Sequence, residues 1–165
     1  MTEAVNFKAK VDAKHLYEFQ MYHSYHSIQG ILSIVVAVLC LIAGISSIGR
    51  VSATYTALYF LFMFLFIVYM PLSLLLRAKQ QSILSDIFKE GLDYTIDEKG
   101  IITRFKKEKG ELSWNQVTKV CQSRHNLMIY SSRVNVYVIP KEEMGEKSEQ
   151  VMQLVKKYVS EEKLK

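Results

Sequence analysis

Charged residues are missing from two long stretches of this 165-residue chain: none occurs between Ser27 and Gly49, and none between Val51 and Leu76. At about 1.5 Å per helical residue, each apolar run matches a hydrocarbon core of about 30 Å. A bilayer requires every backbone polar group to be satisfied within the segment, so we expect both runs to be helices. Two buried helices of a soluble protein are the alternative, but such helices usually carry a polar stripe. The sequence therefore predicts a membrane hairpin with helices at 28–48 and 55–76.

Groups that catalysis or metal binding would use are also scarce. The two cysteines, Cys40 and Cys121, lack metal-ligand spacing, and the sequence has no glycine-rich phosphate loop. Because Cys40 lies within an apolar run, we expect no disulfide to Cys121, which favours a reducing compartment for the soluble part. The apolar runs contain no ionisable group at depth, which disfavours transport. We expect a protein that is not an enzyme and that has no metal, cofactor, nucleic-acid partner or small-molecule substrate.

Positive charge flanks the apolar runs mainly on one side. Three lysines precede the first run and Arg77 and Lys79 follow the second, whereas the break at 49–54 holds only Arg50. Since Lys and Arg are retained on the cytoplasmic side, both termini are predicted to be cytoplasmic, with 49–54 as an outside turn. A secretory signal peptide does not fit, because 27 polar and mixed residues precede the first run.

The remaining sequence predicts an α+β cytoplasmic domain. A strand at 4–11 is followed by a helix that starts at Asp12 and runs straight into the membrane. Past residue 91 the hydrophobic period changes to two, which predicts an antiparallel meander of about five strands, to which strand 4–11 adds, with a helix around 151–158 that covers the sheet. Turns with glycine are expected at 97–100 and 107–110, and a further strand at 111–114. Gly91 is placed to end the helix that precedes these strands. The expected segments are 1–27 (N-terminal strand and pre-membrane helix), 28–76 (hairpin), 77–91 (helical connector) and 92–165 (cytoplasmic domain).

Small residues recur along the first apolar run at alternating spacings of three and four, so they share one face of a helix. Aromatic residues recur along the second run in the same way. We expect the rings of the second helix to pack into the spaces left by the small side chains of the first helix. Binding of the small face to another protein or to a second copy of the chain is the alternative. The small residues are Gly30, Ser33, Ala37, Cys40, Gly44 and Ser47, and the aromatic residues are Tyr55, Tyr59, Phe62, Phe66 and Tyr69.

Histidines are concentrated in front of the first apolar run. His15, Glu18 and His26 fall close to one helical face, and His23 and His26 are three residues apart. That spacing can hold a metal or sense pH, but no third ligand is specified. Interfacial anchoring beside a membrane helix is the interpretation we favour.

Four stretches of the C-terminal half resemble the YcxB-like bacterial membrane proteins. They are YTIDEKGI at 94–101, LSWNQVTKV at 112–120, LMIY at 127–130 and VIPK at 138–141. Two membrane helices before such a domain are also that family's layout. The resemblance implies a multi-pass protein of a bacterial cytoplasmic (inner) membrane. It also implies a fold similar to the pleckstrin-homology (PH) domain, in which a bent antiparallel sheet, or partial barrel, is capped by a C-terminal helix. It supplies no catalytic residues.

Binding is therefore the expected function. A protein partner, or a second copy of the chain, is expected at a sheet edge or beside the C-terminal helix, with Leu154, Tyr158 and Trp114 as candidate contacts. A role as an accessory or self-protection factor for a toxic peptide or a transporter is a further alternative.

Recognition of anionic lipid heads is the second form of binding. The candidate contacts lie on one hairpin and are Arg104, Lys106, Lys107 and Lys109. Each could contribute about 1 kcal/mol near an anionic surface. A solvated hairpin whose charges are offset by Glu108 and Glu111 is the plain alternative.

Overall fold

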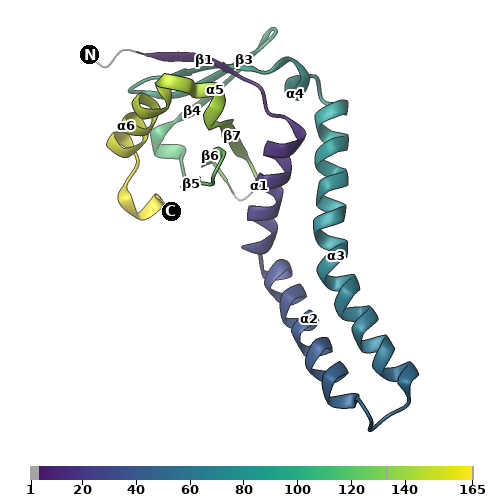
Figure 1. Cartoon of the computed structure of the whole chain (residues 1–165). Helices are drawn as coiled ribbons and strands as arrows, with labels where there is room; N and C mark the ends of the chain where they lie inside the picture. Colours follow the sequence, from purple (N-terminus) through teal and green to yellow (C-terminus); the bar gives the residue numbers. More distant parts are fainter. Residues whose placement is uncertain (1–3, 133, 165) are drawn as a thin grey trace. The chain divides into compact units, whose positions relative to one another are not determined.

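The computed structural model describes residues 4–132 and 134–164 (Figure 1). These residues form two compact units. The sheet unit comprises the described residues up to Phe19 together with those from Lys79 onward, and the hairpin unit comprises residues 20–78. Both cysteines are free, with Cys40 in the hairpin unit and Cys121 buried in the sheet unit.

Long helices form the hairpin unit. Helix α1 (Ala13–Tyr25) starts in the sheet unit and is followed by α2 (Ile28–Ser47) and α3 (Ala53–Leu84). The uninterrupted helix predicted from Asp12 into the membrane is wrong, because the chain leaves the helical conformation at Ser27. The Ser27 hydroxyl accepts a hydrogen bond from the backbone N–H of Gly30 (3.2 Å), so it caps a new helix instead of continuing the old one.

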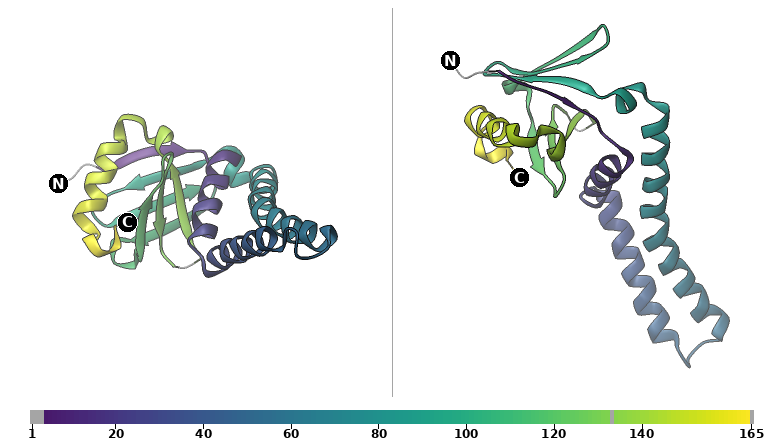
Figure 2. Two further views of the ribbon diagram at one scale, coloured as in Figure 1. Left: turned by 60° about the horizontal axis from the view of Figure 1, so that its bottom comes forward. Right: turned by 45° about the horizontal axis from the view of Figure 1, so that its top comes forward.

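Two antiparallel sheets build the sheet unit, where one meander was expected (Figure 2). The first has the order β1-β2-β3-β4 and the second the order β5-β6-β7, and no closed barrel forms among the described residues. The chain leaves the first sheet at Trp114, predicted as strand, because a capping box between Ser113 and Gln116 starts a short 3-10 helix there. The strands are β1 (Val5–Ala9), β2 (Leu92–Ile96), β3 (Gly100–Phe105), β4 (Glu108–Ser113), β5 (Lys119–Gln122), β6 (Asn126–Tyr130) and β7 (Val136–Pro140).

Short helices complete the sheet unit. The predicted connector helix 77–91 is divided between the end of α3 and α4 (Asp86–Glu90). Gly91 ends α4 as predicted, with a φ of +83°. The others are α5 (Lys141–Met144), α6 (Ser148–Tyr158) and the 3-10 helices η1 (Trp114–Gln116), η2 (Gly145–Lys147) and η3 (Glu161–Lys163).

The hairpin β3–β4 turns earlier than predicted. Phe105 pairs with Glu108, so Lys106 and Lys107 form the turn, and Lys106 has the positive φ of 53°. Gly110, predicted in the turn, lies instead within β4 opposite Thr103. A Cβ at Gly110 would be 2.6 Å from the Thr103 hydroxyl oxygen, so this glycine admits a neighbouring side chain and does not serve the turn.

One hydrophobic core joins both sheets and α6. β1 pairs with β2 as predicted and directs Val5 and Ala9 inward. The apolar face of α6, formed by Val151, Leu154 and Val155, is buried in the same core, and α6 lies at one end of the two sheets (Figure 2). Burial of this stripe explains why an otherwise polar helix is stable there.

Candidate interaction site

An open groove of about 560 Å³ lies between the strand β1 and the helix α6. We call it the α6 groove. β1 is the edge strand of its sheet, so one side of its backbone has no strand partner among the described residues. The groove is lined by Ala4, Val5, Asn6, Lys147, Gln150, Gln153, Leu154 and Lys157.

The polar wall of the α6 groove comes from helical spacing. Lys147, Gln150, Gln153 and Lys157 recur at intervals of three and four residues and are all exposed. Opposite them, the backbone carbonyl of Asn6 accepts a hydrogen bond from Nζ of Lys147 (2.5 Å). The carbonyl of the edge strand is therefore turned toward the helix, away from β2.

In the part of the chain that the structure describes, the lining of the α6 groove carries charge of one sign, with two lysines and no carboxylate. The two glutamine amides can each donate and accept hydrogen bonds. The wall therefore suits a polypeptide that carries acidic side chains and free backbone groups.

Of the three partner contacts predicted from the sequence, Leu154 and Trp114 are buried in the core and Tyr158 is half-buried. Leu154 is 3% exposed and forms only part of the groove floor, and Trp114 is 6% exposed with its Nε1 donating to the carbonyl of Asp97 (2.9 Å). Tyr158 is half-buried, and its ring stacks on Trp114 with centroids 6.1 Å apart. The spacing that marked Leu154 and Tyr158 is that of the buried face of an amphipathic helix. Contacts with a partner would come from the polar residues beside them.

Neighbouring carboxylates neutralise half of the basic hairpin. Nζ of Lys106 lies 3.0 Å from Oε1 of Glu90 and 3.7 Å from Oδ2 of Asp86, both on α4. Lys109 forms an ion pair with Glu111, which is one of the two offsets predicted. Arg104 and Lys107 are exposed. The pairing of Lys106 with the acids of α4 was not predicted. Because of this pairing, the hairpin presents less free positive charge than the sequence suggested.

A polar cluster at α1, which we call the α1 cluster, connects distant parts of the sheet unit. The His15 side chain is 2% exposed and lies between two carboxylates: Nδ1 is 2.6 Å from Oδ1 of Asp12, and Nε2 is 3.1 Å from Oε1 of Glu142 on α5. One turn further, Oε2 of Glu18 is 2.8 Å from Nδ1 of His125. Both ring nitrogens of His15 therefore lie within ion-pair distance of a carboxylate oxygen, one next to α1 and one on α5.

His23 and His26, the pair whose spacing could hold a metal or sense pH, lie outside the α1 cluster. His23 and His26 are exposed, and Nδ1 of His26 is 2.8 Å from the carbonyl of Tyr22 in its own helix. In residues 4–132 and 134–164, no three His, Cys, Asp or Glu side chains are arranged to hold a metal ion. The i, i+3, i+6 spacing of Asp12, His15 and Glu18 was the available signal for one polar face. The distant partners, Glu142 for His15 and His125 for Glu18, lie more than a hundred residues away and could not be found from that spacing.

The pH dependence of stability is expected to include a contribution from Glu18. Partial burial alone would raise the pKa of its carboxyl, but hydrogen bonds with Ser123 and His125 outweigh burial and hold the pKa below the ordinary value of 4.5. A depressed folded-state pKa means that the stabilisation is complete above the unfolded-state pKa and is lost as the pH falls through the folded-state value. In urea unfolding of the full-length protein in detergent, followed by Trp114 fluorescence, Glu18→Gln should lower stability above about pH 5 and match the wild type at more acidic pH. Glu149→Gln, at an exposed α6 position, is the control; an equal effect there would contradict the assignment.

The hairpin unit packs through the small residues of α2. Gly30, Ala37, Gly44 and Ser47 are buried, and Ser33 and Cys40 are half-buried. A Cβ at Gly44 would lie 3.2 Å from the Phe60 ring, and the hydroxyl oxygens of Ser47 and Thr56 are 2.9 Å apart. The small face therefore meets α3 within the chain.

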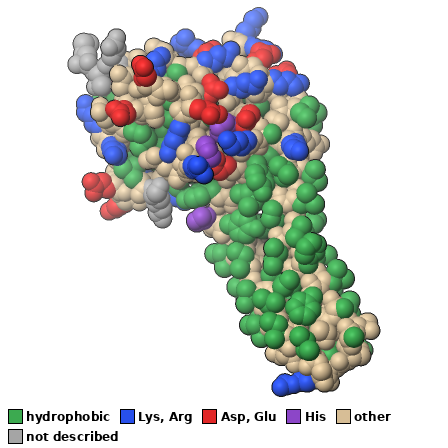
Figure 3. Space-filling model, viewed as in Figure 1, with side chains coloured by type: hydrophobic (Ala, Val, Ile, Leu, Met, Phe, Trp, Pro, Cys, Tyr) green, Lys and Arg blue, Asp and Glu red, His purple; other side chains and the backbone are tan. Residues whose placement is uncertain are grey.

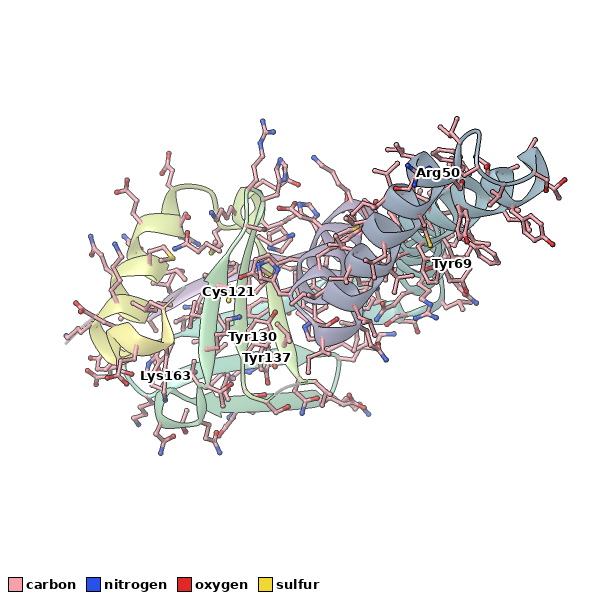
Figure 4. The ribbon with its side chains drawn as sticks, turned by 90° about the horizontal axis from the view of Figure 1, so that it is seen from below. Arg50, Tyr69, Cys121, Tyr130, Tyr137 and Lys163 are labelled. Carbon is pink, nitrogen blue, oxygen red and sulfur yellow. The ribbon has the colours of Figure 1, made fainter. Side chains whose placement is uncertain are left out.

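The face of α3 that meets α2 differs from the one predicted. All five predicted aromatic residues are exposed, and Tyr69 is 67% exposed (Figure 4). A second, apolar pocket lies between α2 and α3, and of the five aromatic residues Phe66 is the one that lines it among the described residues. The less exposed residues come one position later, at Thr56, Phe60 and Met63. The predicted seam is thus right in period and wrong in register on this helix.

Two of the helices are long and apolar enough to cross a membrane, namely α2 and α3. Hydrophobic side chains cover their surface (Figure 3). Residues 96–156 match the protein family described as YcxB-like protein. Neither the curated proteins nor the solved structures include a match to the chain.

Proposed function

We propose that this chain, which carries a YcxB-like domain at residues 96–156, is a membrane-anchored interaction module that docks a protein partner in the α6 groove. The observation that carries the proposal is the groove itself, because it combines the side of β1 that faces no other strand in the described parts of the chain with an exposed row of amides and cations. Exposed strand edges and grooves beside helices are recurrent peptide-recognition surfaces. In this proposal the module is not an enzyme.

Membrane anchoring by α2 and α3 is part of the proposal. Their apolar side chains stay exposed along the whole hairpin, which supports a lipid surrounding. The basic residues that flank the hairpin support an orientation with both termini in the cytoplasm of a bacterium and the turn at Arg50 outside (Figure 4).

A PH-like architecture of the sheet unit is also proposed. Two antiparallel sheets share one core and a C-terminal helix, which supports the likeness. The sheets are separate, so the proposal concerns an open sandwich and not a closed barrel.

Photo-crosslinking of the full-length protein in its native membranes tests the function. A benzophenone amino acid replaces Gln153, inside the α6 groove, and in a control replaces Lys156, which is exposed on α6 but lies outside the lining. We expect a discrete crosslinked protein at position 153 only. Equal capture at both positions, or no protein at either, would contradict docking in the groove.

Lipid recognition by the hairpin remains the second candidate because Arg104 and Lys107 are exposed. The lipids that co-purify with the protein from its native membranes are therefore measured for the wild type and for the double variant Arg104→Gln, Lys107→Gln. Enrichment of an anionic lipid that the double variant abolishes, without a protein partner, would favour this candidate. Capture of a toxic peptide or a transporter subunit would instead point to the accessory or self-protection role.

A further inference from the structure

We infer that the α6 groove selects an extended segment of the partner that carries two acidic residues four positions apart. The inference rests on the proposed function, because it names the chemistry of the partner at the same groove. It follows from the position of the two lysines, the conformation of β1 and the polarity of the lining.

The spacing of the acids follows from the spacing of the lysines. Lys147 and Lys157 are ten residues apart along η2 and α6, which at about 1.5 Å per residue separates their backbones by about 15 Å. An extended chain advances about 3.3 Å per residue, so this distance corresponds to four or five residues. Side chains on an extended chain alternate between two sides. Of the two separations that match the distance, four and five, only four directs both acids to the same side of the extended chain.

Lys147 retains capacity for a ligand. Its ammonium group has three donors, and one of them goes to the Asn6 carbonyl, an uncharged acceptor. A carboxylate would form a shorter and stronger charge-assisted bond with the remaining donors. Lys157 is exposed at the other end of the same wall.

An extended segment fits the groove better than a helix does. Helices dock through an apolar stripe, but the floor residues Val5 and Leu154 are buried and offer little apolar surface. An extended chain has free backbone groups, which can bond the amides of Gln150 and Gln153 and the outer edge of β1. On that edge no other strand pairs among the described residues, and the Asn6 carbonyl is bonded to Lys147. The polar lining and the strand edge therefore favour the same occupant.

Synthetic peptides test the spacing. Fluorescent nine-residue threonine peptides carry two glutamates separated by four, three or two positions, so that composition and charge are identical. Binding to the full-length protein in phosphatidylcholine nanodiscs is followed by fluorescence anisotropy. The peptide with a separation of four should bind about tenfold more tightly than the other two, and about 0.5 M salt should weaken it.

Variants assign the binding to the two lysines. Lys147→Gln and Lys157→Gln should each reduce the affinity of the matched peptide to that of the mismatched ones, whereas Lys156→Gln, which removes the same charge outside the lining, should not. Unchanged Trp114 fluorescence shows that each variant is folded. Equal affinities of the three peptides, or no binding by any, would overturn the spacing inference while a protein crosslinked at position 153 would still support the function. Loss of that crosslink would overturn the function itself.

Discussion

Replacing Gly100 by alanine is expected to destabilise the sheet unit by about 3 kcal/mol, near the upper end of the usual range for one substitution. Gly100 has a φ of +153° and pairs with Ser113 at the start of the β3–β4 ladder. A Cβ at this position would be 2.1 Å from the carbonyl oxygen of Leu112 and 2.9 Å from Cα of Ser113. Both are backbone atoms of the partner strand, so no side-chain rotation relieves the collision and the two strands must separate.

Separation of these strands would also disturb the core. Oδ1 of Asp97 accepts hydrogen bonds from the backbone N–H groups of Lys99 (2.8 Å) and Gly100 (3.1 Å), and the Asp97 carbonyl accepts the indole N–H of Trp114. The turn at Asp97 thereby holds Trp114, whose ring packs against Tyr158 of α6. A local collision is therefore expected to reduce the stability of the whole sheet unit.

Urea unfolding of the full-length protein in detergent measures this effect. Trp114 is the single tryptophan and is bonded to the turn, so its fluorescence reports the transition directly. Gly145→Ala is the matched control, because Gly145 also has a positive φ (+52°) but no atom within 4 Å of a built Cβ. Its expected cost is about 1 kcal/mol, from backbone strain alone. A smaller loss at Gly100 than at Gly145 would show that the ladder accommodates a side chain.

Local periodicity predicted the elements of this chain but not how they combine. The turn at Gly100, the cap at Gly91 and the buried face of α6 depend on residues near one another in sequence, and each was predicted. Division into two sheets depends on the capping box that starts the 3-10 helix at Trp114. This local signal competes with the strand periodicity of the residues before it, so the segment up to Trp114 was predicted as a strand.

The register of α3 was unpredictable for a different reason. Aromatic residues occupy both the predicted face, as at Tyr59 and Phe62, and the face that meets α2, as at Phe60. When rings occur on every side of a helix, their spacing does not identify the packed side. On α2, by contrast, the small residues share one face and large side chains occupy the other faces, so their spacing does identify the packed side of that helix.

The α6 groove was predicted only as a general location. The sequence indicated a surface beside the C-terminal helix or at a sheet edge, and the structure places both in one groove because β1 joins the sheet next to α6. The contacts predicted on α6 were Leu154 and Tyr158, because apolar periodicity is the strongest signal in that helix. The polar residues beside them also recur at intervals of three and four, but that spacing is typical of any solvent-exposed helix face and does not indicate binding.

The α1 cluster supplies the second large expected effect. His15→Ala is expected to destabilise the sheet unit by about 3 kcal/mol, because it leaves a cavity in place of a buried ring and removes the contacts of that ring with two carboxylates. His15→Leu refills most of the space and removes only the contacts with Asp12 and Glu142. Both carboxylates are more than half exposed and can return to water, so this variant should lose only about 1 kcal/mol.

The comparison of these two variants separates packing from charge. The backbone carbonyl of residue 15 keeps its hydrogen bond from Nδ2 of Asn126 in both (3.2 Å in the wild type), so neither loses the polar contact with β6. Urea unfolding measures the free energies, and amide hydrogen exchange at residues 13–19 locates the change in α1. If His15→Leu proves as damaging as His15→Ala, the contacts of the ring with Asp12 and Glu142 hold α1 in place; if both match the wild type, α1 is held without this histidine. The expected ordering, in which the alanine variant is much less stable than the leucine variant, means that α1 is fixed mainly by burial of the ring, while the carboxylates of Asp12 and Glu142 select the orientation of the ring.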